Sequence, residues 1–323
     1  MSARRRFIGA GIAAASLVAM RAWAAYPDRQ PVKIIVPFAA GTGADLVGRA
    51  VADALAARMK VKVTVENLPG EAGATGTVAV KKAAADGHTL LLTSNPLTIT
   101  PYRLKTSPYD PTKDLVAVAQ IAAVPLVLVT SAKSPNKSFE ALVAEMRQKP
   151  GKVAYATSGK GALNHLEVEL IKRELKVDTR DAPQGGDEQA LAATVGGKAG
   201  FMLANLPMAM AQINKGQLRP LAVSSRERMP AMPNVPTIAE AIRKPGYSAS
   251  VWYGVLAPAG TPVAAITRLE NEIQYELEVL AVQARIAAVG GKVAFLRSAP
   301  FGGQIRYEYA KWAQVVRALK LSV

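Results

Sequence analysis

Short apolar runs that alternate with helix-like segments constrain the fold of this chain more than any other feature of its sequence. Residues 32–36 predict a strand, and apolar residues then recur at three- and four-residue spacing through residues 46–59, as on one face of a helix. Further strands are predicted at 61–65 and 90–92, with a short helix at 77–85 between them. This alternation is typical of parallel sheets covered by helices.

The same rhythm returns in the second half of the chain. Strands are predicted at 126–129, 153–156, 200–203, 218–223 and 251–256. Helices are predicted at 138–148, 163–175, 188–195 and 263–279, followed by a shorter helix that ends at 289 and a last one at 303–319. Two long apolar stretches, at 116–129 and 248–256, permit the chain to pass twice between two domains, of which the first would be discontinuous. The length of 323 residues is sufficient for two domains.

The amino terminus has the pattern of an export signal. Three arginines, Arg4 to Arg6, precede a short apolar segment, and Ala22-Trp23-Ala24 matches the small-x-small pattern of signal peptidase sites. We therefore predict that residues 1–24 are a signal peptide cleaved near Ala24 and that the protein is periplasmic. Arg-Arg-x-Phe-Ile also fits a twin-arginine signal, so the twin-arginine and general secretory routes both remain open.

The formal net charge of +16 raises the question of nucleic-acid binding. The Lys and Arg residues are scattered, and only 6% of the residues are aromatic, so the interleaved pattern of single-strand binders is missing. We expect no nucleic-acid partner, and a basic surface that raises the local concentration of anionic ligands.

Four polar or Gly-rich loops follow predicted strands. They lie at 37–45, 68–77, 93–96 and 157–161. Small residues let backbone N–H groups approach an anion, and a following helix directs its positive end toward the same place. If all four loops lie at the carboxyl ends of parallel strands, they converge on one side of the sheets, where α/β proteins bind ligands.

Catalytic and cofactor motifs are missing from this sequence. It has no cysteine, only two histidines and no Gly-x-Ser-x-Gly segment, and the loop at 41–46 is neither a dinucleotide fingerprint nor a Walker A loop. We expect a binding protein that is not an enzyme and that has no cofactor and no bound metal.

Several segments together resemble the substrate-binding proteins of tripartite tricarboxylate transporters, also called Bug receptors. The segments are Val36-Pro37-Phe38-Ala39-Ala40-Gly41-Thr42-Gly43-Ala44-Asp45, Val65-Glu66-Asn67-Leu68-Pro69-Gly70, Asp86-Gly87-His88-Thr89-Leu90, Pro108-Tyr109-Asp110-Pro111, Leu218-Arg219-Pro220-Leu221-Ala222-Val223-Ser224, Val235-Pro236-Thr237 and Pro258-Ala259-Gly260-Thr261-Pro262. Each motif alone is weak, but the ordered set is specific and extends from about Tyr26 to the C-terminus.

The resemblance implies an α/β, two-lobed periplasmic binding protein, type II-like, in which each lobe is a parallel-rich sheet covered by helices and crossover strands join the lobes. It implies lobe 1 at 25–124 and 248–323 and lobe 2 at 125–247. It also implies a monomer that closes like a Venus flytrap around a small organic carboxylate and delivers it to a membrane transporter with one large and one small subunit.

Site residues are carried over from the family by position. The first-lobe set is Phe38, Gly41, Thr42, Gly43, Ala44, Asp45, Ala74, Thr75, Ser94 and Asn95. The second-lobe set is Thr157, Ser158, Gly159, Gln184, Gly185 and Asn205. In the family the first-lobe loops hold a ligand carboxylate, largely through backbone N–H groups and ordered water.

The sequence departs from the family pattern at three places, of which the last two bear on the identity of the ligand. Thr42 interrupts a run of glycines, and the usual Pro-Tyr-basic-Gly segment reads Ala182-Pro183-Gln184-Gly185 here. Asn205 is neutral at a place where the family often has an acid. The identity of the carboxylate therefore stays open. A ligand-presenting sensory protein for a membrane receptor kinase is the alternative function, and the sequence does not separate it from transport.

Overall fold

The computed structural model describes residue 26 and residues 29–321, and the predicted signal peptide lies outside these residues. The strands are β1 (Val32–Val36), β2 (Val63–Asn67), β3 (Thr89–Thr93), β4 (Leu115–Ser131), β5 (Ala154–Thr157), β6 (Arg180–Pro183), β7 (Phe201–Asn205), β8 (Leu218–Val223), β9 (Ser250–Pro258) and β10 (Lys292–Arg297). The helices are α2 (Gly43–Met59), η1 (Glu71–Gly73), α3 (Ala74–Lys81), α4 (Pro96–Arg103), α5 (Phe139–Gln148), α6 (Leu163–Leu175), α7 (Asp187–Val195), α8 (Leu206–Asn214), α9 (Ile238–Ala241), α10 (Val263–Glu276), α11 (Leu280–Ala288) and α12 (Ser298–Ala318).

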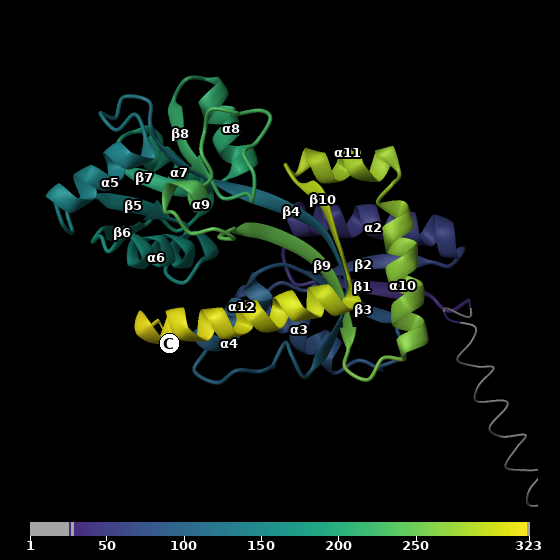
Figure 1. Cartoon of the computed structure of the whole chain (residues 1–323). Helices are drawn as coiled ribbons and strands as arrows, with labels where there is room; N and C mark the ends of the chain where they lie inside the picture. Colours follow the sequence, from purple (N-terminus) through teal and green to yellow (C-terminus); the bar gives the residue numbers. More distant parts are fainter. Residues whose placement is uncertain (1–25, 27–28, 322–323) are drawn as a thin grey trace, which may run out of the picture.

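Two lobes are joined by a pair of long strands, β4 and β9, that run side by side between them (Figure 1). In the first lobe β1 pairs in parallel with β2 and β3, and in the second lobe β5 pairs in parallel with β6 and β7. The first part of β4 pairs with β9, whereas its last part pairs with β7 and β8. The predicted fold class is confirmed, with antiparallel pairing at the strands that cross between the lobes.

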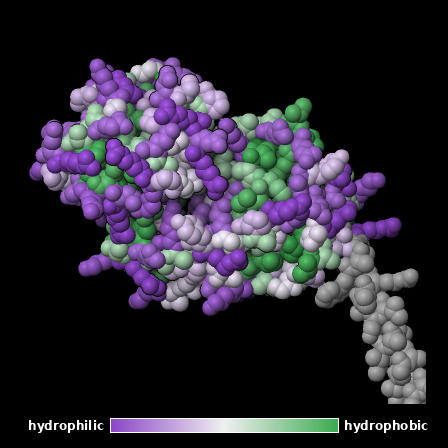
Figure 2. All heavy atoms as spheres, viewed as in Figure 1, coloured by the Kyte–Doolittle hydropathy of each residue, from purple (hydrophilic) through white to green (hydrophobic). Residues whose placement is uncertain are grey.

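Each lobe has its own apolar core. Buried residues of the first-lobe core include Ile34, Leu55 and Leu269, and those of the second-lobe core include Tyr155 and Phe201. All the large apolar side chains that are exposed among the described residues belong to first-lobe elements, with Val263 and Leu280 each 80% exposed. Figure 2 accordingly shows a mainly hydrophilic surface on the second lobe.

Two predicted helices are displaced from their expected positions. The helix predicted at 77–85 is α3, which begins at Ala74 because Gly73, at φ +94°, ends the preceding turn. The helix predicted at 303–319 begins at Ser298, and its two glycines lie inside it, where Gly302 is close to Ala117. The segments α4, β6, α8, α9 and β10 were not predicted.

Helix α12 contacts both lobes (Figure 1). Its residues Trp312 and Val316 are buried against Leu166 of α6 in an apolar cluster between the lobes. Next to this cluster, Lys311 Nζ lies 2.8 Å from a carboxylate oxygen of Glu167, whose side chain is only 2% exposed. Helix α12 therefore connects the two lobes through both apolar contacts and an ion pair.

Glu308 of α12 connects three elements of the first lobe. Its Oε2 accepts a hydrogen bond from Trp252 Nε1 at 2.9 Å and one from Thr98 Oγ1 at 3.4 Å, while Gln304 donates to Oε1 at 3.3 Å. Burial raises the pKa of the Glu308 carboxyl above its usual value, with Lys311 acting in the opposite direction. The carboxylate is thus the shared acceptor of β9, α4 and α12.

A second contact between the lobes lies at Gly290, between α11 and β10. Gly290 has φ +71°, and a Cβ atom built there would fall within the ring of Pro207, at the start of α8. Only a residue without a side chain permits the two lobes to approach this closely at this point.

We expect Gly290→Ala to separate the lobes. The change also places an L-residue in the left-handed region, which costs about 1–2 kcal/mol. Gly216→Ala is a matched control, because Gly216 has φ +67° but a Cβ there would meet nothing within 4 Å. Small-angle scattering should show a larger radius of gyration for the Gly290 variant than for the wild type, and no increase for the control. Equal values for both variants would contradict the contact.

Candidate functional site

A cavity of about 210 Å³ lies between the two lobes. Its lining residues are Ser94, Asn95, Pro96, Leu126, Ser158, Leu163, Asn164, Asp187, Leu203, Asn205 and Val251. The first three belong to the turn from β3 into α4, Leu126 and Val251 to the crossover strands, and the others to the second lobe. The space far exceeds the roughly 15 Å³ that one water molecule requires, so a small ligand fits.

Four polar side chains form the second-lobe wall, and we call them the Asp187 cluster: Ser158, Asn164, Asp187 and Asn205. Ser158 Oγ donates to Asn164 Oδ1 at 3.2 Å, and Asn164 Nδ2 donates to Asp187 Oδ1 at 3.3 Å. Asn205 Nδ2 donates to Asp187 Oδ2 at 3.1 Å. Burial raises the pKa of the Asp187 carboxyl above its usual value. The cluster joins the ends of β5 and β7 to the first turns of α6 and α7.

The first-lobe wall is built by Ser94 and Asn95. The Asn95 side chain is used by the crossover strand: its Nδ2 donates to Ser250 O at 3.1 Å, and its Oδ1 accepts from Trp252 N at 3.2 Å. Asn95 therefore holds β9 at the edge of the cavity. The hydroxyl of the neighbouring Ser94 is the polar side-chain group of this wall that can contact a ligand.

The loop after β1 is held by a buried carboxylate. Asp45 is 2% exposed, and its Oδ2 accepts hydrogen bonds from Gly41 N at 2.9 Å and Arg49 Nε at 3.0 Å. Its Oδ1 accepts from Asn67 Nδ2 at 2.9 Å. Burial alone would raise the pKa of Asp45, but these bonds outweigh it and hold the pKa below its usual value. Asp45 thereby ties the loop after β1 to the end of β2.

The loops after β1 and β2 also pack against each other. A Cβ on Gly76 would lie 2.8 Å from Pro37 Cβ, and Gly73 lies next to the Phe38 ring. A Cβ on Gly43 would meet the hydroxyl of Tyr253 on β9. These loops therefore lie near the same crossover strand that Asn95 holds.

Of the predicted site residues, Ser94, Asn95, Ser158 and Asn205 line the cavity together. The predicted residues that do not line it are Phe38, Gly41, Thr42, Gly43, Ala44, Asp45, Ala74, Thr75, Thr157, Gly159, Gln184 and Gly185. Among these, Ala44, Asp45, Ala74 and Thr157 are buried. Gly41, Thr42, Gln184 and Gly185 are exposed on their loops, and Thr75 is exposed in the first turn of α3. A ligand-binding role for this group stays a prediction.

Asp187 is the main residue that sequence reasoning missed. It follows the Gly185-Gly186 turn and is the first residue of α7, a position at which an acid is usually explained by the helix dipole alone. A strand directly before Asp187 would have placed this residue at a strand end, where ligands bind. That strand, β6, has the polar sequence Arg-Asp-Ala-Pro, which is not typical of a strand. Asn164 was also missed, as were the apolar lining residues Leu126, Leu163, Leu203 and Val251.

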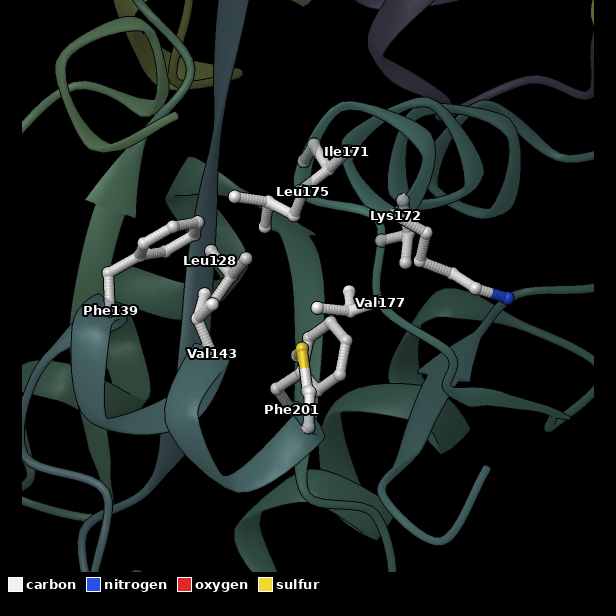
Figure 3. A pocket seen from close by; sticks show the side chains of 10 residues that line it. Leu128, Phe139, Val143, Ile171, Lys172, Leu175, Val177 and Phe201 are labelled. Atoms are coloured by element: carbon white, nitrogen blue, oxygen red, sulfur yellow. The ribbon is translucent and has the colours of Figure 1, made fainter. Parts of the chain in front are cut away.

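A second, much smaller space lies inside the second lobe. Figure 3 shows its apolar lining side chains, among them Leu128, Phe139 and Phe201. Its volume of about 10 Å³ is at the lower limit of the space for one water molecule. We interpret it as a packing gap between α5, α6 and the sheet.

No group of three or more His, Asp or Glu side chains suited to hold a metal ion occurs within residues 29–321. In the same part of the chain, every helix is too short or too polar to cross a membrane.

Comparison with known proteins gives consistent matches. The family model for the tripartite tricarboxylate transporter family receptor, TctC, matches residues 47–321. Protein BugT of Bordetella pertussis is 36% identical over 312 residues, which are 96% of this chain and 95% of the relative.

Solved structures agree with these matches. "R. palustris Rpa4515 with adipate" is 29% identical, with a TM-score of 0.73 over 89% of this chain and 96% of the other. "MatC (Rpa3494) from Rhodopseudomonas palustris with bound malate" is 27% identical, with a TM-score of 0.70 over 88% and 98% of the two chains. The resemblance stated from the sequence motifs is thus confirmed, and so is the expectation of a binding protein instead of an enzyme. This chain belongs to the TctC family of tripartite tricarboxylate transporter receptors, also known as Bug proteins, which are periplasmic solute-binding proteins.

Proposed function

We propose that this protein captures a small organic carboxylate in the cavity between its lobes and delivers it to a tripartite tricarboxylate-type membrane transporter. The observation that carries the proposal is the cavity itself, because polar residues of both lobes, Ser94 on one side and the Asp187 cluster on the other, line one space. A ligand that contacts both walls stabilises the arrangement in which the lobes are close.

Neutral donors suit the capture of a carboxylate. None of the cavity-lining residues is Lys, Arg or His, so hydroxyl, amide and backbone groups have to supply the hydrogen bonds. Hydrogen bonds to an ionised group are roughly twice as strong as neutral ones and avoid the desolvation of a buried cation. Related proteins were solved with adipate and with malate, which supports an organic acid of this size.

The other parts of the proposal rest on the family. They are cleavage of a signal peptide near Ala24, a periplasmic location, a monomeric state, and lobe boundaries at residues 124/125 and 247/248. The separate apolar cores on the two sides of these boundaries support the division. The predicted loop residues at 38–45, 74–75, 157–159 and 184–185 are proposed to complete the site when a ligand is bound.

A ligand screen tests the proposal. We expect at least one organic acid to raise the unfolding temperature, since a ligand at 100 times its Kd adds about 2.7 kcal/mol of stability. Sugars and uncharged amides of equal size should have no effect. Ser158→Ala should reduce the shift, and Ser225→Ala, a half-buried second-lobe control outside the cavity lining, should leave it unchanged. Stabilisation only by sugars would contradict the proposal.

Delivery to a transporter requires a separate measurement. Uptake of the identified acid into vesicles that contain the large and small transporter subunits should depend on this protein. If the ligand-loaded protein instead stimulates a receptor kinase and never uptake, the sensory alternative replaces transport.

A further inference from the structure

Asp187 is the one ionisable side chain among the residues that line the cavity between the lobes. The other polar lining groups are the hydroxyls of Ser94 and Ser158 and the amides of Asn95, Asn164 and Asn205. A lone acid in a site for organic acids needs an explanation, because a ligand carboxylate beside it would meet a charge of the same sign.

The hydrogen bonds of Asp187 favour its ionised form. Each of its two oxygens accepts one amide hydrogen, from Asn164 and Asn205 respectively, and its place in the first turn of α7 adds the positive end of the helix dipole. Burial acts in the opposite direction and outweighs these bonds, so the pKa of Asp187 lies above its usual value and the ionised form needs a cationic neighbour. A carboxylate has about four acceptor positions, so roughly half of the capacity of Asp187 is left for a further donor.

Within the part of the chain that the structure describes, no side-chain cation pairs with this carboxylate. None of the ion pairs found among residues 29–321 includes Asp187. A partly buried charge without an opposite charge is costly, and a bound cation removes that cost. The cavity has the space for such a group next to Asp187.

We propose that Asp187 recognises a cationic nitrogen of the ligand, so that the ligand class is a small organic acid that also carries a protonated amine. The carboxylate half of this class rests on the proposed function, whereas the cationic half rests on Asp187 and its two amide donors. The ligand then lies with its ammonium group at the Asp187 cluster and its carboxylate toward the first-lobe wall and loops.

Matched ligand pairs test this assignment. Succinate and aspartate, glutarate and glutamate, and adipate and 2-aminoadipate differ only by an amino group. Titration calorimetry with the wild-type protein should give, for the best pair, a Kd about tenfold or more lower for the amino acid than for the plain diacid. Asp187→Asn should remove this preference by weakening the amino acid and strengthening the diacid.

A matched control is Asp181→Asn, which removes the same charge from β6, in the same lobe but outside the cavity lining. It should preserve the ligand preference. Unfolding temperatures of both variants show whether each has folded.

The outcomes separate the two proposals. If plain diacids bind and Asp187→Asn leaves their affinity and that of the amino acids unchanged, the inference is overturned and the proposed function stands. If simple alkylamines bind through Asp187 but no organic acid does, the inference stands and the proposed function is overturned. Failure of every amine-bearing compound to bind overturns the inference.

Discussion

Glu308→Ala should lower the free energy of unfolding by about 1–3 kcal/mol, since it leaves the buried Trp252 Nε1 without an acceptor. Trp252 is 1% exposed, so water cannot replace the lost acceptor, whereas Thr98 Oγ1 keeps its hydrogen bond to Asn95 O at 3.0 Å. Urea unfolding followed by Trp fluorescence measures the effect. Glu278→Ala, at an exposed acid of the same lobe, is the control and should stay within about 0.5 kcal/mol of wild type.

Glu308→Gln should instead raise the free energy of unfolding at neutral pH. Because the folded-state pKa of Glu308 is raised, its contribution to stability is fully present below the unfolded-state pKa and is lost as the pH rises through the folded-state pKa. The charged groups that act on it are Lys311 and Glu167. Glutamine keeps an acceptor for Trp252 and never ionises, so its stability advantage over wild type should grow from pH 4.5 to pH 8. A constant difference across that range would refute the role of ionisation.

Asp45→Ala should loosen the loop after β1 and weaken ligand binding together. The loss of hydrogen bonds to a buried carboxylate predicts a cost of about 2–3 kcal/mol, lowered by the half-exposed position of Arg49. Residues 39–44 would lose the link through Asp45, and only the hydrogen bond from Asn67 Nδ2 to Phe38 O at 3.1 Å would still join the start of the loop to β2. The affinity for the ligand should fall about tenfold or more if this loop completes the site.

Asp53→Ala is the matched control for Asp45. Asp53 lies on the same helix and pairs with Arg285 at 2.7 Å, but both side chains are more than half exposed. Such a pair contributes about 0.2–1 kcal/mol. Because the pKa of Asp45 is lowered in the folded state, its contribution is present above its unfolded-state pKa and is lost as the pH falls through the folded-state pKa. The two variants should therefore converge in strong acid; equal effects at pH 7 would argue against the loop-holding role of Asp45.

The elements that the sequence predicted well are those with clear apolar periodicity, such as β1 and α6. Helix α4 was missed because Pro96 and Pro101 are typical of a loop. It forms because Leu97 and Ile99 are buried by their neighbours in the fold. Strand β10 likewise depends on its partner β4, which lies more than a hundred residues earlier.

For the site, local patterns identified loops at strand ends but not their distances from one another. Ser94 and Asn205 share a cavity only because the crossover strands set the orientation of the two lobes. Asp187, at the start of α7, becomes part of the site through its hydrogen bond with Asn205 at the end of β7, and no local sequence pattern predicts this contact.

The position of β9 between β3 and β4 has a consequence for biosynthesis. Strand β3 ends at Thr93, whereas its neighbour β9 begins only at Ser250, so the sheet that contains β1 has an open edge while the whole second lobe is being translated. The first lobe of the nascent chain cannot complete its core until most of the polypeptide has left the ribosome. Chaperones therefore have a long interval in which to bind an incompletely folded chain.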